Sequence, residues 1–202
     1  LVWSIAPDFN GALTRFLTGE TDFFPQLRPD DLKEVAKHKD LRTRTFRSLS
    51  YQFLQFNLRN PNDRDRPHPI FGNRELRRAL TMAVDRAALV RNVYDTLAQP
   101  ALGPTLRVYP TTDPNLQQIP YDPARARQIL DSLGWRVTTR DSMRTRNDRP
   151  LRFTISVPGT SQVRVQYAVL LQEQFRRVGV KADIEKLDFP VLVEKDRKRT
   201  ID

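Results

Sequence analysis

The segment LRFTISVPGTSQVRVQYAVLLQEQFRRVGVKADIEKL, residues 151–187, decides the fold. It opens with the alternating pattern of a strand at Leu151, Phe153, Ile155 and Val157, ended by the Pro-Gly-Thr-Ser run at 158–161. An apolar helical face then follows at Ala168, Leu171, Phe175 and Val178. Gly179 stops this helix, and a second strand pattern comprises Val180, Ala182 and Ile184. A strand, a helix and a strand at this spacing predict a βαβ unit with a right-handed crossover, and hence an α/β fold.

The middle of the chain carries helical signals. Residues 73–97 have apolar side chains at helical spacing after a capping Asn73, and Asp85 offers a second cap, which predicts two helices with a bend. Asp122-Pro123 predicts the start of another helix, which ends at Gly134. The five prolines between 100 and 120 predict an extended, ordered loop. Asn147-Asp148 predicts a tight turn.

The first seventy residues carry weaker signals. Residues 51–58, YQFLQFNL, are apolar on both faces, which predicts a strand buried on both sides. Short strands are also expected at 1–6, 21–24 and 41–46, and helices after Asp8 or Asn10 and from Pro29. The run 60–69 is rich in Pro, Asn, Asp and Arg, and we predict a loop there that crosses between two lobes.

Composition places the chain among globular proteins. Its 202 residues suggest one domain, or one domain with part of another, and 39% hydrophobic content is enough for a core. No stretch approaches the ~18 consecutive apolar residues of a membrane span. Residues 1–7 lack the features of a signal peptide, so an export signal is expected outside this sequence if the protein is exported. The absence of cysteine excludes disulfide scaffolds, thiolate metal sites and cysteine nucleophiles.

The chain is basic, with a formal net charge of +10. A basic surface is typical of nucleic-acid-binding domains, and such a domain is the main alternative function. The basic residues are mostly arginines scattered along the whole sequence, without the aromatic, Cys/His or basic-helix motifs that accompany nucleic-acid binding. Solvated surface positions explain them better, and we expect no nucleic-acid partner.

Motifs for catalysis and metal binding are missing from the sequence. Neither His38 nor His68 lies near a nucleophile elbow, and both are expected at the solvated surface, so no metal site is predicted. No phosphate-binding glycine motif occurs. The run VPGTS at 157–161 could present N–H groups to an anion, but a plain strand-to-helix connection is the simpler interpretation. We expect no enzyme and no cofactor; an α/β enzyme that uses Asp and Arg residues stays open as a further alternative.

Six segments, in order along the chain, resemble the family 5 extracellular solute-binding proteins, which bind oligopeptides, dipeptides, nickel and related solutes. The two most specific are FGNRELRRALTMAVDR at 71–86 and YDPARARQILDSLGW at 121–135. The others are LTGETD at 17–22, YQFLQFN at 51–57, ALGP at 101–104, and RVGV at 177–180 within the βαβ unit. The chain departs from the family pattern at 140–149, where Ser142 and Asp148 stand in place of the glycines of a hairpin turn.

The resemblance implies a periplasmic-binding-protein-like (type II) fold, in which two lobes close on a ligand. Residues 1–50 are then expected to form part of lobe one, and residues 51–202 most of lobe two, truncated at its C-terminal end. The implied function is transport: a monomeric receptor of an ABC importer that binds oligopeptides, dipeptides or another small solute and docks on a membrane permease. The implied location is periplasmic or extracellular, with anchoring as a lipoprotein one form of it. A sensor or chaperone role on the same fold stays open.

Loops at strand ends are expected to contact the ligand of such a receptor. The candidate ligand-binding residues are Asn57, Thr105, Thr160, Ser161 and Gln162, and the candidate hinge residues are Tyr51 and Asn57. The charged residues of the 71–86 signature are expected to be structural instead, with Arg77 and Arg78 in helix-surface pairs and Asp85 as a cap.

Overall fold

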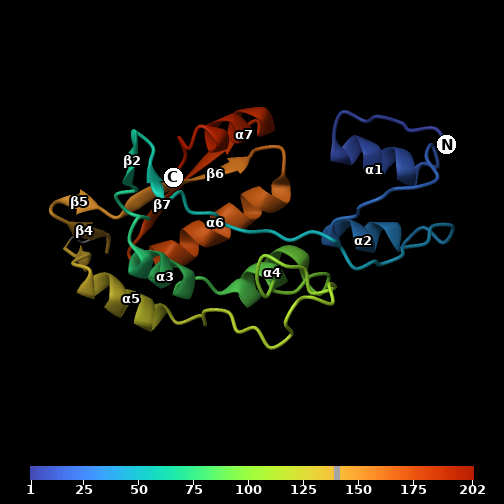
Figure 1. Ribbon diagram of the computed structural model, residues 1–202. Coiled ribbons are helices and arrows are strands. Elements are labelled where there is room, and N and C mark those ends of the chain that lie inside the picture. The colour runs from blue at the N-terminus through green and yellow to red at the C-terminus, as the bar shows by residue number, and fades with distance from the viewer. Residues whose placement is uncertain (139–141) are drawn as a thin grey trace.

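The computed structural model describes residues 1–138 and 142–202, which form a small helical unit and a larger α/β body (Figure 1). The helical unit consists of α1 (Phe9–Leu17) and α2 (Pro29–Val35). It lies at one end of the molecule, and an extended segment joins it to the body (Figure 1). Leu13, Phe16 and Val35 form its own small core, which is separate from the large core of the body.

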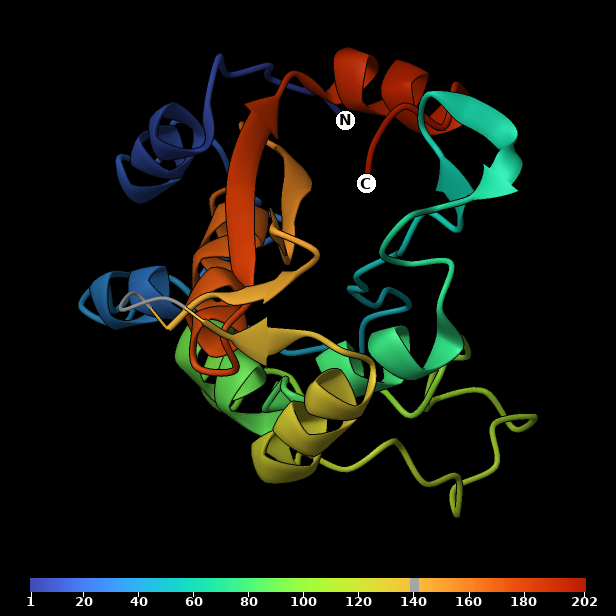
Figure 2. The same cartoon turned by 90° about the vertical axis from the view of Figure 1, so that its left-hand side faces the viewer.

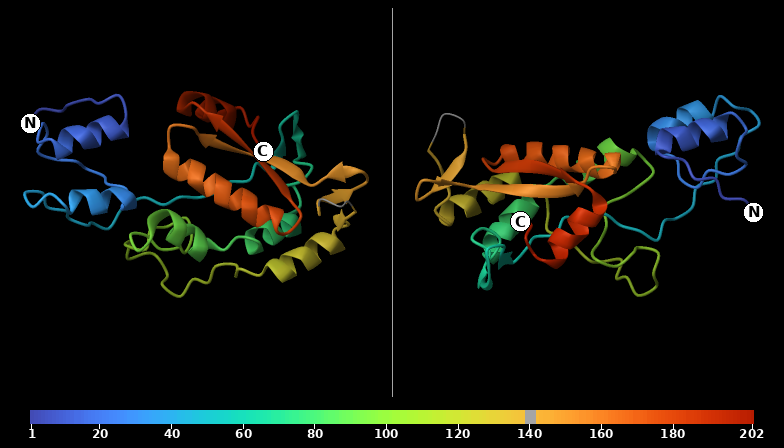
Figure 3. Two further views of the ribbon diagram at one scale, coloured as in Figure 1. Left: turned by 180° about the vertical axis from the view of Figure 1, so that it is seen from behind. Right: turned by 90° about the horizontal axis from the view of Figure 1, so that it is seen from above.

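The predicted βαβ unit is confirmed and forms the centre of the body. Strands β6 (Arg152–Pro158) and β7 (Lys181–Leu187) pair in parallel along their whole length, and α6 (Gln162–Arg176) connects them. Helix α6 lies along one face of this pair and α7 (Phe189–Arg197) on the other side, as the right-hand view of Figure 3 shows. The predicted apolar face of α6 is buried, with Ala168, Leu171 and Phe175 at 8% exposure or less.

The predicted break at Asp85 is also confirmed. Helices α3 (Arg74–Met82) and α4 (Arg86–Tyr94) flank it, and the Asp85 carboxylate accepts a hydrogen bond from Ala88 N at 2.9 Å. Asn73 caps α3 in the same way, and Asp122 caps α5 (Pro123–Ser132). Each helix begins where a short polar side chain satisfies an N–H group that has no partner within the helix, so these starts are predictable from sequence.

A small antiparallel sheet of β3 (Arg136–Val137), β4 (Arg144–Arg146) and β5 (Arg149–Pro150) follows α5. Asn147 and Asp148 make the predicted tight turn between β4 and β5, with φ values of 50° and 60°. Short polar side chains tolerate this left-handed region better than most. Residues 140 and 141, the first two of the stretch 140–149 where the sequence departs from the family pattern, lie outside the described residues.

Arg144 ties this sheet to the rest of the body. Its side chain is 3% exposed, and its guanidinium donates to Trp135 O and the Asp131 carboxylate at 2.6 Å and to Val178 O at 2.7 Å. Gly179, at φ +80°, makes room for it, because a Cβ there would lie 2.8 Å from the Arg144 Cγ. The glycine that ends α6 is therefore also required by the arginine packed against it.

Several predictions for the first seventy residues are wrong. The predicted loop at 60–69 contains a hairpin of β1 (Arg59–Asn60) and β2 (Asp63–Pro67), and β2 is exposed throughout, so no apolar alternation marks it. The predicted strand 51–58 is extended but mostly exposed, and it pairs with no strand in the described part of the chain. The expected strands at 1–6, 21–24 and 41–46 are likewise unpaired. An apolar run becomes a strand where another strand accepts its hydrogen bonds, and within residues 1–138 and 142–202 these runs have no such neighbour.

The two predicted helices of the first forty residues and the predicted loop at 100–120 are confirmed. The Asp8 side chain caps α1, and Gly19 follows its end at φ +77°. Residues 100–120 contain neither helix nor strand, as the prolines predict. Helix α7 was not predicted, although Asp188 before it and proline in its first turn are start signals.

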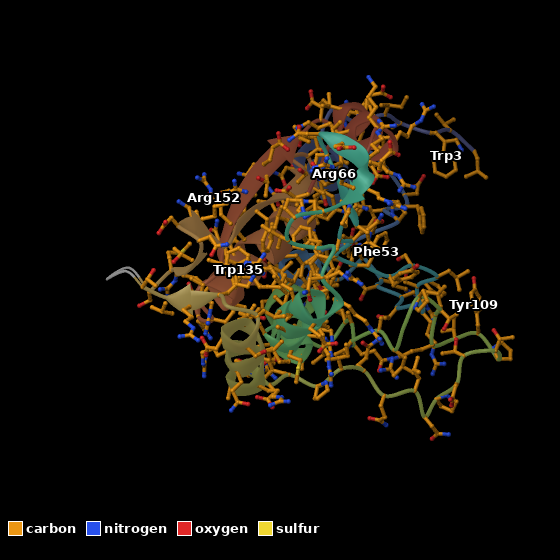
Figure 4. All side chains as sticks on the ribbon, turned by 60° about the vertical axis from the view of Figure 1, so that its left-hand side comes forward. Trp3, Phe53, Arg66, Tyr109, Trp135 and Arg152 are labelled. Atoms are coloured by element: carbon orange, nitrogen blue, oxygen red, sulfur yellow. The ribbon has the colours of Figure 1, made fainter. Side chains whose placement is uncertain are left out.

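A run of aromatic contacts joins the elements of the body. Ring centroids lie 4.9 Å apart between Phe56 and Phe71, 5.0 Å between Phe71 and Phe153, and 5.4 Å between Phe153 and Phe175. These contacts connect the extended segment, the turn before α3, the sheet and α6 in one core. Other aromatics are exposed: Figure 4 shows Trp3, Phe53 and Tyr109 on the side of the molecule opposite Trp135 and Arg152.

The core predicts a large difference between two truncations on the same helix. Phe175→Ala should lower the free energy of unfolding by about 3–5 kcal/mol, because it opens a cavity between α6 and β6. Val169→Ala, at a half-exposed position of α6, should change it by less than about 0.5 kcal/mol. Urea unfolding followed by circular dichroism measures both, and equal costs would mean that α6 does not bury this face.

Candidate functional site

The carboxyl ends of β6 and β7 open onto the N-terminus of α6. Gly159 N donates to Leu187 O at 2.8 Å, which closes the two strand ends, and the chain then turns through Thr160 into the helix. Ser161 caps α6, but its hydroxyl lies 3.5 Å from Arg164 N, at the limit of a hydrogen bond. The first turn of α6 carries no acidic side chain. In α/β folds this edge of the sheet is where ligands bind, and helix N–H groups there favour an anionic or carbonyl oxygen.

Three of the sequence-predicted ligand residues come together at this edge. Thr160 and Gln162 are exposed, and Ser161 between them is half-buried. Thr105 lies elsewhere, exposed in the 100–120 loop, and no hydrogen bond or ion pair of the described residues links it to the α6 N-terminus. The structure thus groups the predicted residues of the βα connection and leaves Thr105 apart from them.

The helical unit meets the same edge through Arg28, which sequence reasoning missed. Its guanidinium donates to Gln162 Oε1 at 2.8 Å, to Asn10 Oδ1 at 2.9 Å and to the Asp31 carboxylate at 2.8 Å, and it lies 3.9 Å above the Phe9 ring. The hydrogen bond with Asp31 raises the pKa of Arg28. Asp31 and Asn10 hold the guanidinium in place, so it presents a fixed charge to the start of α6. The sequence signal is Arg-Pro-Asp-Asp at 28–31, where Asp31 also caps α2 by accepting from Arg28 N.

A second contact joins the extended segment to α6. Arg164 Nε, in the first turn of the helix, donates to Gln52 Oε1 at 3.4 Å. Behind it, the rings of Tyr94 on α4 and Tyr167 on α6 lie 6.1 Å apart. Burial raises the pKa of both phenols, that of Tyr167 to about 12, so both hydroxyls stay neutral and can donate as well as accept hydrogen bonds.

Asn57, predicted as both hinge and ligand residue, joins two distant passages of the chain. Its amide Nδ2 donates to Ile201 O at 2.7 Å and to Arg199 O at 3.2 Å, while its Oδ1 accepts from Arg59 N at 3.1 Å. The segment that enters the body and the segment at the end of the sequence therefore lie side by side here (Figure 1). Tyr51, the other predicted hinge residue, is exposed and packs only against Phe53, 5.6 Å between centroids, among the aromatic pairs of the described residues.

His68 is buried at 4% exposure, so the prediction of a solvated surface histidine is wrong. Its Nδ1 accepts from Ile70 N at 3.1 Å and Phe71 N at 2.9 Å, and its ring stacks on Phe71. Because Nδ1 accepts two N–H groups, the proton resides on Nε2, which faces the Asp202 carboxylate at 3.3 Å. The flanking prolines suggested an exposed loop. The histidine is buried instead because its ring accepts hydrogen bonds from the backbone N–H groups of Ile70 and Phe71 in the turn before α3.

Asp202 completes a latch between the end of the sequence and the sheet. One carboxylate oxygen faces His68 and the other accepts from Thr154 N on β6 at 2.7 Å. Burial acts to raise the pKa of Asp202, but the hydrogen bonds from His68 and Thr154 outweigh it and lower the pKa. The carboxylate is therefore held ionised in the folded protein.

The lowered pKa predicts a pH-dependent contribution of Asp202 to stability. The stabilisation is fully present above the unfolded value of about 4 and is lost as pH falls through the lower folded value. Asp202→Asn should lower the free energy of unfolding by about 1 kcal/mol at pH 7. The difference between this variant and the unchanged protein should become smaller as the pH falls towards 3. Thermal unfolding across this range measures it against Asp22→Asn, an exposed control; parallel pH profiles of Asp202→Asn and the unchanged protein would contradict the latch.

Two of the charged residues of the 71–86 signature have the roles expected of them: Arg78 pairs with Glu75 at 3.6 Å on the helix surface, and Asp85 caps α4. Arg77 is structural in another way, because it donates to Phe71 O at 2.6 Å in the turn before α3 instead of pairing on the helix surface. In the part of the chain that the structure describes, no three His, Asp or Glu side chains cluster as a metal site requires. No helix among the described residues is both long and apolar enough to cross a bilayer.

Comparison with known proteins assigns the family. The model of the bacterial extracellular solute-binding proteins, family 5 middle, matches residues 1–202. The chain belongs to the family 5 solute-binding proteins. The family consists of solute-binding proteins rather than enzymes, and the match gives no support to the nucleic-acid alternative. The match is to the middle region of the family, and it agrees with the resemblance of residues 71–86 and 121–135 to family signatures.

Relatives of this family 5 chain include peptide-binding proteins. It is 27% identical over 197 residues to the oligopeptide-binding protein AppA of Bacillus subtilis, covering 96% of this chain and 34% of that protein. It is 24% identical over 200 residues to di/tripeptide-binding protein 2 of Pseudomonas aeruginosa, covering 98% of this chain and 34% of that protein. The chain thus spans about a third of the length of the relatives it matches.

Solved structures of the family confirm the fold. The structure of AppA from Bacillus subtilis in complex with a nonapeptide superimposes with a TM-score of 0.77 at 27% identity, over 95% of this chain and 36% of that one. The substrate-binding protein CtaP of Listeria monocytogenes gives a TM-score of 0.74 at 20% identity, over 98% of this chain and 37% of that one. The family 5 chain therefore has part of the type II periplasmic-binding-protein fold, as the sequence predicts.

Proposed function

We propose that this chain is part of the receptor of an ABC importer that captures oligopeptides or dipeptides. The observation that carries the proposal is the family match over the whole chain together with the relative solved in complex with a nonapeptide. The local structure is compatible with this proposal. Two units with separate cores meet at the carboxyl edge of a parallel sheet, and the groups that face each other there, Arg28 and Gln162, are polar.

The proposed mechanism is closure of two lobes on the ligand, with residues 1–50 in lobe one and 51–202 in lobe two. Open and closed states of such a receptor differ little in free energy, and a ligand that contacts both lobes favours the closed one. Asn57 suits a hinge, because its side-chain amide joins the segment that enters the body to the segment at 199–201 by hydrogen bonds to backbone carbonyls. Tyr51, exposed in the unpaired segment, is the second hinge candidate.

The proposed ligand contacts lie mainly at the start of α6. Thr160, Ser161 and Gln162 offer two hydroxyls, an amide and the free N–H groups of the first helical turn. These groups suit the carbonyl oxygens and carboxylate of a peptide and make no demand on its side chains. Asn57 and Thr105 remain proposed contacts of the same kind, on the crossing segment and the long loop.

The remaining properties of the receptor follow from the same proposal. It acts as a monomer outside the cytoplasmic membrane, periplasmic or extracellular, with a lipid anchor as one arrangement. The closed form docks on the membrane permease of the importer. No cofactor takes part, since binding and closure involve no covalent chemistry.

The direct test is mass spectrometry of ligands released from the full-length protein purified without denaturation. A ladder of short peptides is expected. A single metal complex or sugar would keep the receptor and change its solute. Nucleic acid that stays bound at high salt would contradict the proposal. Non-specific electrostatic binding to nucleic acid weakens steeply with salt, so nucleic acid that is retained at high salt would be a specific partner.

Arg28 gives a prediction for closure. Arg28→Lys keeps the charge but cannot reach Gln162, Asn10 and Asp31 together, so ligand affinity should fall roughly threefold to tenfold, mainly through faster dissociation. Arg15→Lys, at a position on α1 that faces only Glu20 among the ion pairs described, is the matched control. Stopped-flow binding of the released peptides measures both, and identical dissociation rates would show that the Arg28 contact does not hold the lobes together.

A further inference from the structure

The β4–β5 hairpin places two like charges directly opposite each other. Arg146 and Arg149 are cross-strand partners on either side of the Asn147–Asp148 turn, and both are exposed. Like charges at facing positions of an antiparallel pair destabilise it. Sequence patterns that oppose local stability without a compensating gain are concentrated at functional sites. The pair therefore calls for a role other than holding the hairpin together.

Neither arginine has a carboxylate partner in the described part of the chain. Arg146 donates to Leu133 O at 3.3 Å and lies 4.7 Å above the Trp135 ring, and Arg149 makes no ion pair there. Neighbouring arginines differ: Arg144 pairs with Asp131, and Arg152 with Asp183. Among the residues that the structure describes, the two positive charges at the hairpin thus have no opposite charge paired with them.

These arginines border a surface hollow beside a buried indole. The hollow, called here the arginine hollow, is lined by Pro69, Ile70, Trp135, Arg146, Asn147, Arg149 and Pro150, with no acidic side chain among them. Trp135 is 4% exposed, and its Nε1–H has no hydrogen-bond partner among the residues on either side of the 139–141 gap. A buried N–H without a partner costs free energy, which a hydrogen-bond acceptor that reaches it would recover.

We propose that the arginine hollow is a docking site for a carboxylate-bearing segment of a partner protein. A glutamate side chain matches it: the aliphatic part packs on Pro69, Ile70 and Pro150, and the carboxylate meets the guanidinium groups and the indole N–H. A concave hollow with apolar walls suits a single inserted side chain better than the flat surface of an anionic bilayer. The hairpin lies at the end of the body away from α1 and α2, so this docking leaves the proposed ligand edge free (Figure 1). It is independent of the solute bound there.

The indole N–H of Trp135 provides the readout. The probe is tetraglutamate blocked at both ends, with blocked tetraglutamine as its uncharged match, titrated into ¹⁵N-labelled protein. The Trp135 indole signal, assigned by its loss in Trp135→Phe, should shift with tetraglutamate in a salt-sensitive way and stay in place with tetraglutamine. Peptide bound at the α6 edge instead would leave this signal unmoved.

Two variants separate docking from stability. Arg149→Glu replaces a repelling pair with an attracting one, so it should raise the unfolding temperature of the protein while weakening tetraglutamate binding about tenfold or more. Arg136→Gln, exposed on β3 and outside the lining of the hollow, should leave binding within about twofold.

Three results would overturn the proposal. The first is a Trp135 signal that does not respond to tetraglutamate at millimolar concentration. The second is full retention of binding in Arg149→Glu. The third is a protein that does not bind tetraglutamate but binds phosphatidylglycerol vesicles, and loses this vesicle binding in Arg149→Glu. That result would assign the arginines to a membrane surface instead.

Discussion

Phe153 on β6 and Phe175 on α6 meet edge to face at 5.4 Å, and the body is arranged around this contact. It fixes the helix across the parallel strand pair, and Phe71 extends it to the turn before α3. With α6 fixed, its N-terminus stays at the carboxyl edge of the sheet, where Gln162 accepts a hydrogen bond from Arg28 of the helical unit. Packing in the core thus determines where the polar groups of the site are presented.

Polar side-chain contacts join the segment that contains Asn57 and His68 to the segment at the end of the sequence. Asn57 binds the backbone at 199–201, and His68 and Thr154 bind Asp202. Each of these groups is hydrogen-bonded to backbone or to an ionised partner, which gives direction without a large apolar interface. A receptor that closes about such a region needs passages that stay joined while the units on either side rotate. The polar character of the junction suits that need better than a continuous core.

Sequence alone predicts the elements that carry their own signals. The βαβ unit, the Asp85 break, the Asp122-Pro123 start and the Asn147-Asp148 turn all depend on periodicity or on a cap within a few residues. Residues 51–58 could not be settled in this way, because a strand depends on a partner that no local pattern supplies.

The site shows the same limit. The βα connection was predicted from its place after a strand, whereas Arg28 and His68 derive their roles from partners far along the chain, Gln162 and Asp202. Their residue types suggested surface positions, and a buried, partnered histidine cannot be told from an exposed one by spacing. Asn57 and Gln162 were both selected from sequence and are also joined to distant segments, but the sequence did not indicate their partners, Ile201 and Arg28.

The measurement that tests closure most directly is small-angle X-ray scattering of the full-length protein with and without a mixture of short peptides. Closure of two lobes on a ligand predicts a smaller radius of gyration when peptide is bound. An unchanged radius in protein that demonstrably binds peptide would contradict it, and would mean that the helical unit and the body keep one fixed arrangement.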